Sequence, residues 1–191
     1  MSSFFGIFNP KGTGIDKEAF EQMRQAADQP GHDGIQIYVD EYIALGHVML
    51  RVSPESQYDQ QPLKSSCGNY ILVGHFRLDY RDELGDKLGL TQAELENTPD
   101  SHLAMKAYQK WKEKCVNHIE GDWCCLIYDI NKVRVDLLKC PVGIAALFYG
   151  KFDDVLFIGT DTAYILNQNT INFKVDYKEL RRLSTISAYP S

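Results

Sequence analysis

The sequence lacks an excess of positive charge, a long apolar run and a basic N-terminal segment. It carries 20 Lys and Arg against 26 Asp and Glu, a formal net charge of −6. Nucleic-acid-binding proteins neutralise phosphates with clustered Lys and Arg, so we expect no nucleic-acid partner. No apolar stretch reaches the roughly 18 residues that span a bilayer. The segment from Met1 to Phe8 is too short for a signal peptide. We therefore expect no membrane partner and a cytoplasmic location.

The sequence also lacks a C-x-x-C spacing, and its cysteine count of 5 is odd. Both facts argue against a disulfide framework and a zinc site. Cys124 and Cys125 are adjacent in a strand-like run, so their side chains should point to opposite faces. We expect buried reduced thiols that act as small hydrophobes. We predict no metal site and no cofactor in this chain.

What is present suits a single globular domain. The 191 residues are 44% hydrophobic and 24% charged, which is typical of a domain with a proper core. Apolar alternation predicts strands in both halves of the chain, and helical spacing predicts helices mainly between them. That order favours the α+β class over β-α-β alternation. We take 1–191 as one domain.

The expected elements follow from periodicity and from turn residues. Residues 53–68 are polar and interrupted by prolines, which predicts a long surface loop. Asp16, Asp100 or Ser101, and Asp176 are the expected caps of three helices. We expect strands over 4–8, 35–39, 42–51, 70–78, 123–128, 133–138, 146–149 and 155–160, and helices over 16–27, 79–88, 91–94, 100–114, 162–166 and 176–184.

Several short motifs occur in the order found in one enzyme family. Phe5-Gly6 keeps the register of the Met-Cys-Gly-Ile-Phe-Gly start of class II glutamine amidotransferases. Together the motifs resemble the N-terminal glutaminase domain of the asparagine synthetase family. The resemblance implies a four-layer α/β/β/α sandwich of antiparallel sheets, as in N-terminal nucleophile hydrolases. The other matching segments are 31–34, 46–50, 61–63, 100–111, 121–129, 141–149 and 157–166.

The residues that such a domain needs for glutamine hydrolysis are mostly replaced. The resemblance places Ser2 at the nucleophilic cysteine, whose own α-amine is the base. Met49 takes the place of the arginine that clamps the glutamine carboxylate. Gly74-His75 falls in the segment whose asparagine completes the oxyanion hole. Asp100 matches the residue that binds the substrate amine, although it can equally cap its helix.

A further segment, 76–84, resembles asparagine synthetase-related proteins that include lasso-peptide cyclases. Those proteins join such a domain to an ATP-dependent synthetase domain. That domain's Ser-Gly-Gly-x-Asp-Ser loop does not occur in this sequence. We therefore expect a synthetase partner in cis or in trans, with residues 170–191 as the start of a linker.

Three functional hypotheses remain open. The first is an amidotransferase-like domain without glutaminase activity that supports a linked amide-forming enzyme. The second is an amidohydrolase that uses Ser2 after removal of Met1. The third is a stand-alone module that binds a peptide or a protein. A peptide or an amino acid is the expected ligand class, and His47 is expected to be a satisfied core histidine.

Overall fold

The computed structural model describes residues 2–52, 54–168 and 177–178. The strands are β1 Ser3–Phe8, β2 Gly34–Val39, β3 Ile43–Met49, β4 Leu63–Lys64, β5 Tyr70–Asp79, β6 Glu120–Asp129, β7 Arg134–Lys139, β8 Phe148–Phe152 and β9 Val155–Gly159. The helices are α1 Lys17–Ala27, α2 Arg81–Leu88, α3 Gln92–Glu96, α4 Asp100–Trp111 and α5 Thr162–Leu166, with 3₁₀ turns η1 Glu55–Tyr58 and η2 Lys112–Asn117.

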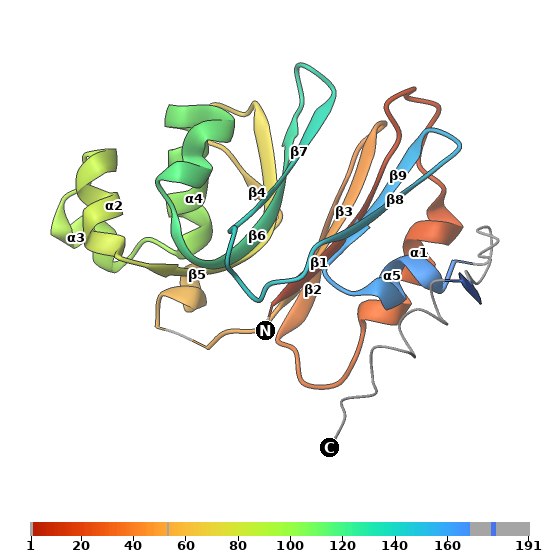
Figure 1. Cartoon of the computed structure of the whole chain (residues 1–191), viewed down its shortest axis with the longest axis horizontal. Coiled ribbons are helices and arrows are strands. Elements are labelled where there is room, and N and C mark those ends of the chain that lie inside the picture. The colour runs from red at the N-terminus through yellow and green to blue at the C-terminus, as the bar shows by residue number, and fades with distance from the viewer. Residues whose placement is uncertain (1, 53, 169–176, 179–191) are drawn as a thin grey trace.

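The elements form four layers (Figure 1). One antiparallel sheet has the strand order β2-β3-β1-β9-β8 and the other has the order β4-β5-β6-β7. Helices α1 and α5 cover the outer face of the first sheet, and α2 to α4 lie outside the second. The inner faces pack on each other through Phe4, Leu45, Val73 and Leu126. This arrangement confirms the predicted α+β class and the α/β/β/α sandwich.

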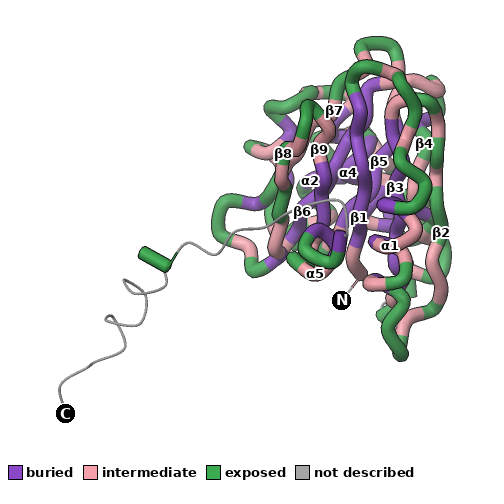
Figure 2. Tube along the Cα trace, turned by 90° about the vertical axis from the view of Figure 1, so that its right-hand side faces the viewer, coloured by how far each residue is buried: buried purple, intermediate pink, exposed green. Residues whose placement is uncertain are grey.

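The side chains of β1 point alternately into two buried layers, which explains why its sequence is a continuous apolar run. Phe4 and Phe8 point into the layer between the sheets, whereas Phe5 and Ile7 point toward α1. A strand that is covered on both faces has no solvent side for polar residues. Figure 2 shows this as buried trace along the middle of the fold.

The second sheet sorts its side chains in the same way. On β5, Ile71 and Val73 face the other sheet, whereas Leu72 and Leu78 face the helices. On β6, Cys124 belongs to the layer between the sheets and Cys125 to the layer under the helices. The prediction of opposite faces is confirmed. The same alternation directs His75 toward the layer between the sheets.

The structure corrects two local predictions. Helix α4 ends at Trp111, where Lys112 takes a φ of 54°, and a 3₁₀ turn follows. The segment 53–68 is not simply a surface loop, because it contains η1, β4 and the buried Gln61 and Ser65. The predicted helix 176–184 lies outside the described residues except for Tyr177 and Lys178. Within the described part of the chain, no helix is long and apolar enough to cross a membrane.

Candidate functional site

A pocket of about 850 Å³ opens at one end of the layer between the sheets. Every residue that the sequence places at the family site lines it, namely Ser2, Met49, Gly74, His75 and Asp100. They come from the residue before β1, the end of β3, the middle of β5 and the start of α4. The family motifs therefore converge in space, although they are spread over some hundred positions of the chain.

Ser2 is held by the backbone of the strand next to it. Its hydroxyl donates a hydrogen bond to the Leu50 carbonyl at 3.2 Å and accepts one from the Leu50 N–H at 3.1 Å. A serine nucleophile needs a base that takes its proton, and a peptide carbonyl is not such a base. In this arrangement the Ser2 hydroxyl is a structural link between β1 and the end of β3.

Met49 forms a buried part of the pocket wall, and a cation lies beside it. Met49 is only 8% exposed, so the clamp position holds an apolar side chain. The guanidinium of Arg51 returns toward it, with Nη2 3.7 Å from the Met49 sulfur. The sequence predicts that Arg51 lies one strand step away from the clamp position. The structure shows that the Arg51 side chain is long enough to bring its guanidinium back to Met49.

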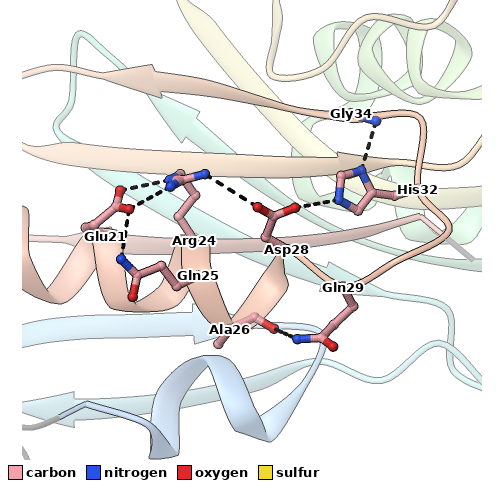
Figure 3. A network of polar contacts seen from close by, with 8 residues as sticks. All are labelled: Glu21, Arg24, Gln25, Ala26, Asp28, Gln29, His32 and Gly34. Atoms are coloured by element: carbon pink, nitrogen blue, oxygen red, sulfur yellow. Dashed lines mark hydrogen bonds and ion pairs between the residues drawn. The ribbon is translucent and has the colours of Figure 1, made fainter.

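The end of β3 is fixed by the loop between α1 and β2. The Asp33 carboxylate accepts the backbone N–H of Arg51 at 2.7 Å, and the Asp33 N–H donates to the Met49 carbonyl. His32 anchors this loop, because one ring nitrogen contacts Asp28 at 2.9 Å and the other accepts the Gly34 N–H (Figure 3). The loop thus determines where the Arg51 backbone sits.

Gly74 contributes backbone to the pocket and has no room for a side chain. A Cβ there would lie 2.7 Å from the Cys124 carbonyl oxygen and from Cys125 Cβ. Its N–H donates to the buried Gln61 side chain at 2.7 Å. An asparagine side chain at position 74 would therefore require the neighbouring strand atoms to shift. The neighbouring side chain that faces the layer between the sheets is His75.

A chain of buried polar contacts supports this part of the pocket. Gln61 Nε2 donates to Asp59 at 2.9 Å, and the other Asp59 oxygen accepts the Ser101 hydroxyl at 2.6 Å. Ser101 is fully buried and lies in the first turn of α4. The polar composition of residues 53–68 predicts an exposed loop. The burial of Gln61 is evident only from its tertiary contacts.

Asp100 does not cap its helix. It is the first residue of α4, whose cap position is Pro99 and lacks a side-chain bond. One Asp100 oxygen accepts the Leu78 N–H at 2.9 Å, and the other forms an ion pair with Arg81. Arg81 also donates to the carbonyls of Leu95 and Thr98. Arg81 therefore points inward from the start of α2, although it lies in a run of charged residues.

His47 is the buried polar side chain that the prediction described as satisfied. It is 2% exposed, and neither ring nitrogen has a hydrogen-bond partner among the described residues. Burial lowers its pKa to about 4, an effect that the nearby Asp59 carboxylate and Gly74 backbone only partly offset. A neutral imidazole with unpaired nitrogens thus lines the pocket.

Two other histidines border the same region. Burial lowers the pKa of His75, and the Asp122 carboxylate partly opposes that effect. Burial also lowers the pKa of His102, next to Ser101. Among the described residues, no group of three His, Cys, Asp or Glu side chains is placed to hold a metal ion.

The two facing antiparallel sheets, covered by helices on both outer faces, form the fold of N-terminal nucleophile hydrolases. A solved structure with this fold is the glutamine phosphoribosylpyrophosphate amidotransferase of B. subtilis complexed with ADP and GMP. It aligns with a TM-score of 0.60 and 16% identity over 86% of this chain and 43% of the other.

Family membership follows from the sequence match. The model of the glutamine amidotransferase domain matches residues 1–191, and the chain belongs to that family. Among its relatives is asparagine synthetase [glutamine-hydrolyzing] 3 of Bacillus subtilis, 22% identical over 84% of this chain. Asparagine synthetase [glutamine-hydrolyzing] 1 of the same organism is 22% identical over 100% of this chain. The chain spans 26% and 30% of these two relatives.

Proposed function

We propose that this chain is an amidotransferase-like domain that does not hydrolyse glutamine. It serves substrate recognition or support in an asparagine synthetase-related, ATP-dependent amide-forming enzyme. The synthetase domain is supplied in cis or in trans. The relatedness to glutamine-hydrolysing asparagine synthetases motivates the partner, and the pocket motivates the loss of glutaminase activity.

The observation that carries this proposal is the engagement of Asp100. Both of its oxygens are used by the protein itself, one by the Leu78 N–H and one by Arg81. The ammonium group of a free amino acid would have to compete with these two partners for the remaining lone pairs of Asp100. Hydrogen bonds to charged groups are worth about 1.5–3 kcal/mol, or roughly 10- to 100-fold in affinity. The pocket is therefore poorly suited to free glutamine.

The residues at the nucleophile and clamp positions also argue against glutamine hydrolysis. The Ser2 proton is directed at the Leu50 carbonyl, and Met49 offers no charge to a carboxylate. The alternative, an amidohydrolase that uses Ser2, requires this hydroxyl to leave Leu50 and reach the α-amine as its base. Met1 removal is a condition for that reaction. One assay separates the two functions.

The test is glutamate release from L-glutamine by protein whose processed N-terminus has been verified by intact mass. We expect no release above that of the Ser2→Ala variant. Ser3→Ala is the matched control, because the Ser3 hydroxyl bonds to Tyr164 on the other face of β1. Release that Ser2→Ala abolishes and Ser3→Ala retains would overturn the proposal in favour of the amidohydrolase.

A further inference from the structure

The pocket contains one arginine that is well placed for a ligand. Arg51 lines the pocket and is exposed, and its guanidinium lies beside the Met49 sulfur. None of the ion pairs between described residues uses Arg51. The Arg51 backbone N–H is hydrogen-bonded to Asp33, which fixes the position from which the side chain extends. The planar guanidinium of Arg51 is suited to bind a carboxylate in the pocket through two parallel hydrogen bonds.

Four acidic side chains line the pocket; Asp79 is exposed, and the other three already accept hydrogen bonds or ion pairs from the protein. Asp100 binds Arg81 and Leu78, and Asp59 binds Gln61 and Ser101. An Asp122 oxygen accepts the Ala145 N–H at 2.8 Å. An ammonium group that leaves water needs a carboxylate partner, since an unpaired buried charge is costly. The interior thus suits a ligand with a carboxylate and without a free amine.

His47 provides an independent indication of the ligand's polar chemistry. Its two ring nitrogens are buried in the pocket wall; the Gly74 backbone lies near the ring, but neither nitrogen makes a hydrogen bond of ordinary geometry among the described residues. Buried polar atoms are normally hydrogen-bonded, so such a pair points to a group that the ligand supplies. A neutral imidazole offers one donor and one acceptor, which an amide N–H and C=O can match.

The remaining walls are apolar. Leu50, Phe76 and Leu78 line the pocket, and Val52, Val142 and Ile144 are 81%, 92% and 86% exposed at its lining. Exposed aliphatic side chains that gather around a pocket are typical of a binding site for apolar groups. The ligand should therefore present an aliphatic portion as well as its polar groups.

We propose that the pocket binds a carboxylate whose neighbouring nitrogen is acylated, with an aliphatic side chain. An N-acyl amino acid and the C-terminal residue of a peptide share this chemistry. Arg51 binds the carboxylate and His47 the amide, while the engaged Asp100 disfavours a free amine. The inference rests on the proposed function, because it names the substrate class recognised by the pocket that has lost its glutaminase residues.

The experiment is calorimetric titration of the full chain with N-acetyl-L-leucine, L-leucine, N-acetyl-L-leucinamide and a capped dipeptide ending in leucine. We expect N-acetyl-leucine or the dipeptide to bind at least tenfold more tightly than leucine and the carboxamide. Preference for the dipeptide assigns a peptide terminus as the source, and equal binding assigns the shared group alone. Binding of leucine as tight as that of N-acetyl-leucine, or absence of binding by both carboxylate ligands, overturns the inference.

Two variants test whether Arg51 binds the ligand carboxylate. Arg51→Gln should weaken N-acetyl-leucine or dipeptide binding by about 10- to 100-fold. The control Lys17→Gln at the start of α1, outside the pocket, also removes one positive charge and should change binding less than twofold. Thermal melts verify that both variants fold, and the ring nitrogen resonances of His47 should shift on ligand addition. Unchanged affinity in Arg51→Gln contradicts the assignment. Glutamate release, measured separately, decides the proposed function whatever the binding result.

Discussion

Replacement of His47 by glutamine should change how stability depends on pH. His47 is 2% exposed, and its folded pKa is about 4 against an ordinary 6.5. A folded pKa below the unfolded one means that the unfolded chain takes up the proton first as pH falls. The contribution to stability is therefore complete above pH 6.5 and is lost progressively as pH falls toward 4.

The magnitude follows from linkage. One proton taken up on unfolding changes the free energy of unfolding by about 1.4 kcal/mol per pH unit. With the two pKa values above, the loss between pH 7 and pH 5 is about 2 kcal/mol. That range stays above most carboxylate titrations. His75 and His102 have lowered pKa values as well and act with the same sign, so the wild-type slope includes them.

Urea unfolding at several pH values measures the effect as a difference between proteins. His47→Gln should lose about 2 kcal/mol less than the wild type between pH 7 and pH 5, whatever its stability at pH 7. The control is Ile158→Val, which shortens a fully buried side chain between the sheets without removing a titratable group. It should be less stable by about 0.5–1.5 kcal/mol with an unchanged slope. Equal slopes for the wild type and His47→Gln would refute the reasoning.

Three further outcomes are expected. Gly74→Asn should lower the free energy of unfolding by about 1–3 kcal/mol in a urea titration, because its Cβ meets the Cys124 carbonyl and Cys125. Gly89→Asn should cost less, because the site has open space and asparagine tolerates its φ of 77° better than other side chains do. Arg81→Met should cost about 1–3 kcal/mol in the same assay, since Asp100 and two carbonyls lose a donor, and a cost below 0.5 kcal/mol would contradict that role. Thr91→Ala removes the capping box of α3 and should lower stability by about 1 kcal/mol, whereas the exposed Gln92→Ala beside it should be nearly neutral.

The parts of the fold that follow from periodicity were predictable. The apolar pattern predicts the strands other than β4, and Asp16 is predictable as a cap because its hydrogen bonds are local. The opposite faces of Cys124 and Cys125 follow from strand geometry alone. Which sheet each strand joins does not follow in this way. The pairing of β1 with both β3 and β9 joins residues that lie some 40 and 150 positions apart.

The candidate site was predictable only as a set of positions. Motif order identified Ser2, Met49 and Asp100, and all of them line one pocket. What these residues do depends on side-chain contacts that the sequence does not show. The sequence could not show that Asp100 pairs with Arg81, that Arg51 folds back on Met49, or that His47 lacks partners. It also could not show that position 74 has no room for a side chain.

The most direct test of the central claim is glutamate release from glutamine by the N-terminally processed protein and by a Ser2→Cys/Met49→Arg variant. The variant restores a thiol and a clamp, but Asp100 stays paired with Arg81. The wild type should release no glutamate above the level of Ser2→Ala. Glutamate release by the wild type that disappears in Ser2→Ala would contradict the account, whatever the variant does.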